Sequence, residues 1–117
     1  MGLDISFAIA DANGLPRLFR RFGDALVLSA TLVPAKAYTA AITQTATEDL
    51  ILLVADGGNL MGMNICDSSI SLVPGGVPLT VNGKVVGAIG VGGGTKEQDL
   101  EIANFVIQKF RKIILQE

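Results

Sequence analysis

The 117-residue sequence contains no histidine, no tryptophan and a single cysteine, Cys66. The absence of histidine excludes Ser-His-Asp and Cys-His catalysis and removes the commonest transition-metal ligand. One cysteine cannot form an intramolecular disulfide, and a structural zinc site needs several ligands of this kind. We therefore interpret Cys66 as a buried thiol in the reducing cytoplasm, with a reactive thiol as the alternative.

The sequence also lacks long apolar runs and a strong charge of either sign. No run approaches the roughly 18 apolar residues of a membrane span, and the N-terminus lacks the basic segment of a signal peptide. The net charge of −2 provides no basic surface, and aromatic residues make up only 5% of the chain. Nucleic-acid binding needs both a basic surface and stacking side chains. We expect a cytoplasmic protein with neither a membrane nor a nucleic-acid partner.

What the chain does have is apolar residues, which make up 50% of the sequence. Its length fits a single domain over residues 1–117, and no repeat or linker divides it. Charged residues are only 17% of the total, so the apolar content exceeds what one small core needs. We therefore expect a homo-oligomer, because self-association would bury the remainder.

The pattern of the strands predicts antiparallel pairing. Alternating apolar residues at Ile5–Ala10 predict a strand, and the Asn-Gly turn at Asp11–Gly14 returns the chain into a second strand at Leu15–Arg21. Asn82-Gly83 is typical of a type I′ hairpin turn. Three further strands are expected at Ser69–Val73, Val77–Val81 and Lys84–Val91.

Helices are predicted in the middle and at the end of the chain. Ser29 or Thr31 opens the central helix, and a short helix runs from Thr47 to about Val54. Thr95 and Gln98 form a capping box that begins the last helix. Because the helices do not alternate with the strands, the sequence predicts an α+β fold rather than a parallel α/β sheet.

The best local candidate for a binding site is the glycine run before the last helix. Gly92, Gly93 and Gly94 directly precede Thr95, and backbone N–H groups at a helix N-terminus can receive a carboxylate or phosphate. The alternative is that the glycines only make a sharp junction between strand and helix. Both interpretations remain open at this point.

The central helix carries a second polar feature. Lys36, Thr39 and Thr43 lie on one face, which either borders a ligand pocket or contacts water. A lysine can act as a base where burial depresses its pKa.

Four segments resemble the GlcG/HbpS family, also called the haem-degrading domain family, which includes the C-terminal domain of PduO-type corrinoid adenosyltransferases. The segments are GGVPL at Gly75–Leu79, GAIGVGGGTKEQD at Gly87–Asp99, the hairpin at Ala10–Arg21, and the helical segment Ser29–Leu50 that contains Lys36. The resemblance covers nearly the whole chain.

This resemblance implies a profilin-like fold, a five-stranded antiparallel sheet with helices packed against it. Relatives carry a further helix before the first strand, whereas four residues precede the first strand here. We expect that helix to be missing, which would leave an apolar face for a partner to cover.

The resemblance also makes haem or a corrinoid the possible cofactor. PduO-type domains use a histidine just after the first hairpin turn, and the matching position here is Leu15, so this ligation does not carry over. Haem could then be held without a side-chain ligand or by one of Lys36, Tyr38, Met61, Met63 and Cys66.

We therefore expect a non-enzymatic binding or accessory domain for a small anionic or amphipathic molecule. Its pocket is expected between Lys36, the break at Gly75 and Gly76, and the junction at Gly92–Thr95. The alternative is an isomerase or lyase that acts on a small organic acid with Lys36 or Tyr38.

Overall fold

The computed structural model describes residues 4–55 and 57–115. Within these residues four strands form one sheet in the order β2-β1-β4-β3, and each neighbouring pair is antiparallel. The strands are β1 (Ser6–Asp11), β2 (Pro16–Arg21), β3 (Gly76–Val81) and β4 (Lys84–Gly92). The helices are α1 (Ser29–Thr43), α2 (Thr47–Val54), α3 (Met63–Cys66) and α4 (Lys96–Leu115). This arrangement confirms the α+β class.

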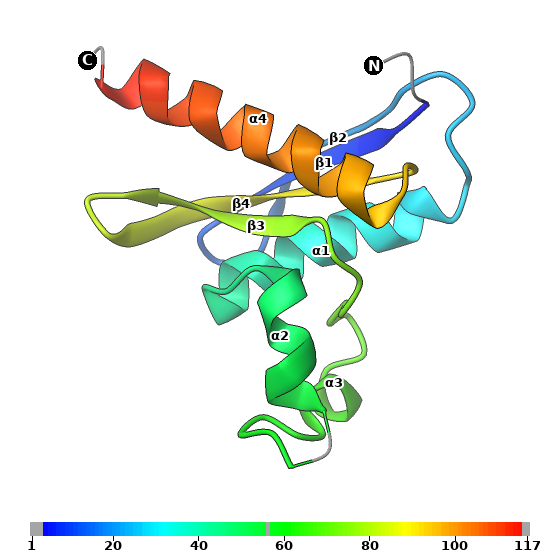
Figure 1. Ribbon diagram of the computed structural model, residues 1–117, viewed down its shortest axis with the longest axis vertical. Helices are drawn as coiled ribbons and strands as arrows, with labels where there is room; N and C mark the ends of the chain where they lie inside the picture. The colour runs from blue at the N-terminus through cyan, green and yellow to red at the C-terminus, as the bar shows by residue number, and fades with distance from the viewer. Residues whose placement is uncertain (1–3, 56, 116–117) are drawn as a thin grey trace.

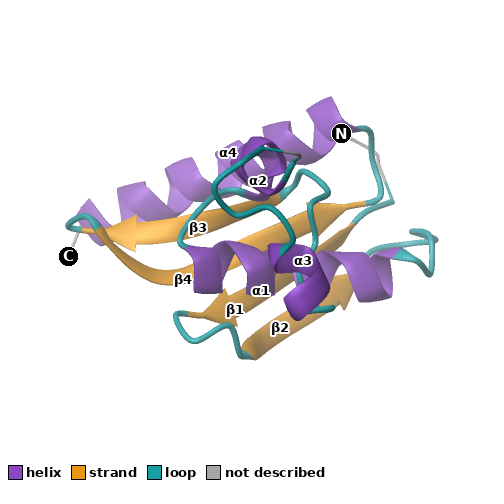
Figure 2. Ribbon diagram, turned by 90° about the horizontal axis from the view of Figure 1, so that it is seen from below, coloured by secondary structure: helices purple, strands orange, loops and turns teal. Residues whose placement is uncertain are grey.

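Helices cover both faces of the sheet, with α1 on one face and α4 on the other (Figure 1). Figure 2 shows the same layers from below, with α2 and α3 on the α1 side. Small side chains fill the contact between α1 and the sheet: Ala8, Ala10, Val33, Ala37, Ala40, Ala41 and Ala88. Larger side chains fill the contact with α4: Leu79, Ile89, Val91, Ala103 and Ile107. The core is therefore split by the sheet into two layers.

Close packing of α1 on the sheet depends on a glycine. A Cβ atom added to Gly90 of β4 would meet the backbone carbonyl oxygen of Val33 in α1. The absence of a side chain at Gly90 thus lets the helix backbone lie directly against the strand. This approach brings the Lys36 side of α1 to the end of β4.

The predicted hairpin turn is confirmed. Asn82 and Gly83 join β3 to β4 and have φ angles of 52° and 76°, both in the left-handed region that a type I′ turn needs. The first hairpin is also confirmed, with β1 and β2 paired across the turn that ends at Gly14.

The prediction of five strands is wrong, because residues 69–73 form a loop and the sheet has four strands among the described residues. The backbone N–H groups of Ser69, Ser71 and Val73 donate to side chains, and that of Ile70 donates to the Asp67 carbonyl oxygen, instead of to a neighbouring strand. The Ser71 N–H donates to the Thr39 hydroxyl oxygen over 2.8 Å, and the Val73 N–H donates to the Ser71 hydroxyl oxygen over 3.3 Å. The loop is therefore fixed to α1 rather than to the sheet edge.

Cys66 is exposed rather than buried, because α3 lies at the periphery of the molecule (Figure 1). The expected absence of a helix before the first strand concerns residues 1–3, which lie outside the described residues. In the described part of the chain, no helix combines the length and apolar composition needed to cross a bilayer.

Candidate functional site

Lys36 is the most deeply buried charged side chain among the described residues, with 2% of its surface exposed. It extends from α1 toward the end of β4, where its Nζ atom donates a hydrogen bond to the carbonyl oxygen of Val91 over 2.8 Å. The same Nζ atom lies 3.7 Å from Oδ2 of Asp99 in α4. Lys36 therefore links a helix on one face of the sheet to a helix on the other.

Glycines make the space that this ammonium group occupies. A Cβ atom on Gly75 would lie 3.0 Å from Lys36 Nζ, and one on Gly92 would lie 3.1 Å from it. A Cβ atom on Gly76 would meet the carbonyl oxygen of Lys36 itself. The structure thus brings these four residues together, as the sequence predicted.

The junction before α4 has the predicted capping box. The Gln98 N–H donates to Thr95 Oγ1 over 3.2 Å, and the Thr95 N–H donates to Gln98 Oε1 over 2.8 Å. The Gly94 N–H donates to Asp99 Oδ1 over 3.0 Å. The backbone N–H groups of Gly94 and Thr95 are therefore already occupied by side chains of the chain itself, the Asp99 carboxylate and the Gln98 amide.

Sequence reasoning missed Asp99 as a site residue. Its carboxylate joins the Gly94 N–H to Lys36, two groups that are distant in the sequence. The available signal was an acidic residue in the first turn of a helix that follows a glycine run. Nothing in the spacing indicated that Lys36 would reach the same carboxylate.

A cavity of about 170 Å³ opens beside this pair, and we call it the Lys36 cavity. Lys36, Asp99 and the glycines 92–94 line its polar end. Its apolar walls are Leu26, Leu28, Leu32, Val33 and Val73. Since one water molecule takes up about 30 Å³ of liquid, the cavity suits a molecule of a few heavy atoms.

Burial shifts both ionisable groups toward their neutral forms. Removal from water lowers the pKa of Lys36, and the nearby Asp99 carboxylate opposes that shift. Burial likewise raises the pKa of Asp99, against the Gly94 N–H and Lys36, which favour the carboxylate. An amine and an acid with such pKa shifts can exchange protons with a bound molecule.

A larger groove of about 670 Å³ lies between α1, the β1–β2 hairpin and the loop at Ser68 and Ser69, and we call it the Tyr38 groove. Its lining is mainly apolar, with Pro16, Leu18, Phe19, Pro34 and Ala35 among the walls. Arg17 provides a positive charge at the groove.

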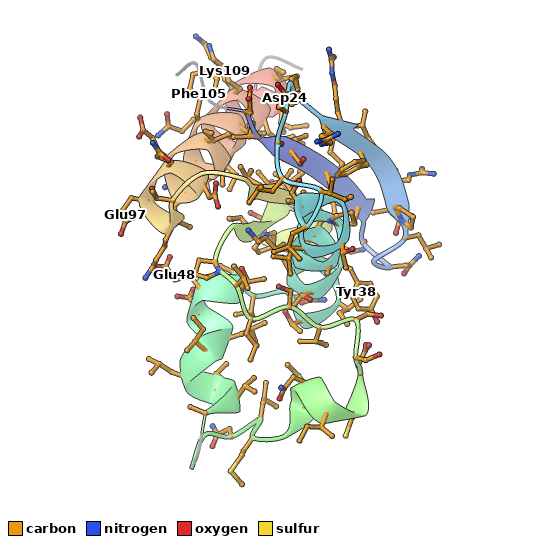
Figure 3. All side chains as sticks on the ribbon, turned by 90° about the vertical axis from the view of Figure 1, so that its right-hand side faces the viewer. Asp24, Tyr38, Glu48, Glu97, Phe105 and Lys109 are labelled. Atoms are coloured by element: carbon orange, nitrogen blue, oxygen red, sulfur yellow. The ribbon has the colours of Figure 1, made fainter. Side chains whose placement is uncertain are left out.

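Tyr38 lies on α1 near the first hairpin turn (Figure 3). A Cβ atom on Gly14 would lie 2.8 Å from its ring. The Tyr38 hydroxyl donates to Asp67 Oδ2 over 2.6 Å. This hydrogen bond raises the pKa of Tyr38 and lowers the pKa of Asp67. The phenol therefore keeps its proton.

The side chains that the sequence offered for holding haem lie in different places. Tyr38 lines the Tyr38 groove and Lys36 lines the Lys36 cavity. Met61 is exposed, like Cys66, and Met63 is half-buried in α3. Tyr38 and Lys36, the two residues of the enzymatic alternative, thus do not share a pocket. Within residues 4–55 and 57–115, no cluster of three or more acidic or cysteine side chains could hold a metal ion.

The family model described as "Haem degrading protein HbpS-like" matches residues 1–108. The chain belongs to the HbpS-like family. This match confirms the resemblance drawn from the glycine-rich segments and covers both the Lys36 cavity and the Tyr38 groove.

Several relatives of this HbpS-like chain agree with the assignment. An uncharacterized 15.0 kDa protein in the dhaT-dhaS intergenic region of Citrobacter freundii is 34% identical over 97% of this chain and 80% of that protein. The corrinoid adenosyltransferase PduO of the same organism is 36% identical over 88% of this chain. This chain spans only 31% of the length of PduO.

Among solved structures, the PduOC:haem complex is similar to this chain with a TM-score of 0.85 and 34% sequence identity. The similarity covers 91% of this chain and 78% of that one. The antiparallel sheet with packed helices is therefore shared with the family, and this chain has four strands in its described residues.

Proposed function

We propose that this chain is a non-enzymatic binding or accessory domain that takes up an apolar molecule with an anionic group in the Tyr38 groove. The observation that carries the proposal is the groove itself. Its volume of about 670 Å³ lies within the range of roughly 300–1,000 Å³ that is typical of small-molecule sites. The haem bound by the similar PduOC domain makes a tetrapyrrole, either haem or a corrinoid, the ligand class to test.

Charge at the groove favours the anionic group. The Arg17 side chain is 70% exposed and lies 3.9 Å from Asp11 Oδ2, a distance typical of a weak surface pair. Its guanidinium group can therefore turn to a ligand carboxylate, for which its planar donors are well suited. The apolar walls formed by Pro16, Phe19 and Pro34 would contact the body of the ligand.

The side chains fit a porphyrin ring with carboxylates better than they fit its iron. The sequence has no histidine, and the Tyr38 hydroxyl at the groove keeps its proton through the hydrogen bond to Asp67. Iron coordination by a tyrosine requires the phenolate form. We therefore propose that affinity depends on the apolar ring and the carboxylates, with no contribution from an axial side chain.

Titration of the purified protein with haemin, metal-free protoporphyrin IX and cobalamin tests this proposal. Absorbance follows haemin and cobalamin, and the fluorescence of protoporphyrin IX itself follows that ligand, without interference from tryptophan, which the sequence lacks. We expect the dissociation constants of haemin and protoporphyrin IX to agree within about threefold, which is less than 1 kcal/mol. Binding of haemin about a hundredfold tighter than protoporphyrin IX would contradict the proposed mode of binding. Failure of all three ligands to bind would contradict the function.

The charged contact has its own test. Arg17→Gln should weaken protoporphyrin IX binding by about two- to fivefold, as expected for one partly exposed ion pair. Arg111→Gln is a matched control, since Arg111 is exposed on α4. If Arg17→Gln and Arg111→Gln changed the affinity for protoporphyrin IX equally, Arg17 would not contact the ligand.

We also propose that the domain works as a homo-oligomer. Support comes from large apolar side chains that are more than a third exposed, among them Leu15, Leu26, Val27, Leu28 and Phe105. Leu26, Val27 and Leu28 follow one another in the chain, and contiguous exposed apolar surface is typical of protein interfaces.

A further inference from the structure

We propose that the Lys36 cavity is a second, separate site, where the Lys36 amine condenses with a small uncharged aldehyde or ketone and Asp99 transfers the protons. This inference does not rest on ligand binding in the Tyr38 groove, because the two sites have different linings. It differs from the enzymatic alternative derived from the sequence, because the substrate proposed here is an uncharged carbonyl compound and not a small organic acid.

The nucleophile is held inside the cavity rather than at the surface. Lys36 lines the cavity with 2% of its surface exposed, and its Nζ atom is fixed by the carbonyl oxygen of Val91 at 2.8 Å. Side chains at positions 75 and 92 would begin about 3 Å from Nζ, as the added Cβ atoms at 3.0 and 3.1 Å show. Glycine at both positions therefore leaves the space that the Nζ atom occupies at the cavity wall.

The charges around the cavity select against an anion. Asp99 is also nearly buried, and its Oδ2 atom lies 3.7 Å from Lys36 Nζ. An anionic ligand at the amine would sit beside this carboxylate and be repelled by it. A neutral carbonyl compound meets no such repulsion, and short alkyl groups match the walls formed by Leu28, Leu32 and Val73.

The same burial supplies the reactive form of the amine. Desolvation lowers the pKa of Lys36, which increases the fraction of neutral amine compared with an exposed lysine. Only the neutral amine can attack a carbonyl carbon.

The reaction balances without an oxidant or reductant. The Nζ lone pair forms a C–N bond to the carbonyl carbon, and the electron pair of the C=O double bond moves to the oxygen. The Asp99 carboxylate accepts a proton from Nζ and returns it to that oxygen, which gives a carbinolamine. A second proton then passes from Nζ through Asp99 to the hydroxyl group, which leaves as water while the nitrogen lone pair forms the C=N bond. One amine and one carbonyl compound thus give one imine and one water.

Reductive trapping on the intact wild-type protein tests the proposal without any variant. The protein is incubated with propanal and cyanoborohydride, which converts an imine into a stable amine, and the modified lysines are identified by peptide mass spectrometry. We expect Lys36 to be modified about tenfold faster than the exposed Lys96 and Lys109, a difference of roughly 1.4 kcal/mol in activation free energy. Modification of Lys36 at the same rate as these lysines, or more slowly, would overturn the proposal.

Two further arms test the roles of charge and of Asp99. Glyoxylate, an anionic aldehyde of similar size, should modify Lys36 more slowly than propanal, and the reverse order would overturn the assigned substrate class.

Asp99→Asn keeps an oxygen that can accept from the Gly94 N–H. It should slow modification of Lys36 about tenfold and leave Lys96 unchanged. If circular dichroism shows this variant folded and its Lys36 reacts at the wild-type rate, Asp99 does not transfer the protons.

Discussion

Nζ of Lys36 lies 3.7 Å from Oδ2 of Asp99, and the two side chains are only 2% and 7% exposed. The pair joins α1 and α4 across the end of β4, where Gly75 and Gly92 leave room for it. Burial of two charges opposes folding unless each keeps its partner. The stability of the fold therefore depends on keeping these two side chains together.

Removal of one partner should destabilise the fold strongly. We expect Lys36→Met to lower the free energy of unfolding by about 3–5 kcal/mol, because Asp99 would remain buried without its cation. Addition of Asp99→Asn should recover most of this loss, since an amide carries no charge and still accepts from Gly94. Urea unfolding followed by circular dichroism measures both effects.

The exposed pair of Lys96 and Glu48 provides the control. Its atoms also lie 3.7 Å apart, but the side chains are 53% and 43% exposed. Lys96→Met should therefore change the free energy of unfolding by less than about 1 kcal/mol. If Lys96→Met and Lys36→Met had equal effects, the argument from burial would be wrong.

The pKa shifts predict how stability depends on pH. The pKa of Lys36 in the folded chain lies below its ordinary value of 10.5, so between these two values the unfolded chain binds more protons. The contribution of Lys36 to the free energy of unfolding must then rise with pH in that window. Asp99 behaves in the opposite way, and its contribution falls as pH rises from 3.8 to its raised pKa.

Urea unfolding of the wild type and of the Lys36→Met, Asp99→Asn double variant isolates these contributions. The stability of the wild type relative to the variant should increase from neutral pH toward 10.5. A constant difference over this range would show that the folded Lys36 titrates like an exposed lysine.

The capping box at the start of α4 should contribute measurably. Thr95→Ala removes the hydroxyl oxygen that accepts from the Gln98 N–H, and we expect a loss of about 0.5–2 kcal/mol in the free energy of unfolding. Thr31→Ala, at an exposed position of α1, should stay within about 0.5 kcal/mol of the wild type. Thermal or urea unfolding of both variants separates the cap from a general effect of losing threonine.

Self-association should be visible in the molar mass of the protein in solution. We expect size-exclusion chromatography with light scattering to give a multiple of the 12.2 kDa chain mass. Val27, which is 73% exposed before α1, should favour association, so Val27→Ser is expected to shift the distribution toward the monomer. A mass of one chain at every concentration would contradict the oligomer.

Local chemistry explains which parts of the fold could be predicted from the sequence. The Asn82-Gly83 turn and the Thr95 capping box follow from residues that are adjacent in the chain, and both are confirmed. The loop at residues 69–73 could not be predicted, because its backbone bonds to Thr39 of α1, which is distant in the sequence. An apolar alternating pattern there favoured a strand that the tertiary contact excludes.

The same distinction holds for the site. Glycines around a lysine could be expected to form a pocket, and Lys36 does lie among Gly75, Gly76 and Gly92. The contact with Asp99 depends on how α4 packs across the sheet, which no local pattern reports. The Tyr38 groove depends likewise on the distance between α1 and the first hairpin.

The most direct test of the proposed function is protoporphyrin IX binding by a variant with a filled groove. Ala35→Trp places an indole on the α1 wall of the Tyr38 groove, and Ala30→Trp places the same side chain at an exposed position of α1. We predict that Ala35→Trp weakens binding by about tenfold or more, roughly 1.4 kcal/mol, and that Ala30→Trp binds like the wild type. Equal affinities of the two folded variants would contradict ligand binding in this groove.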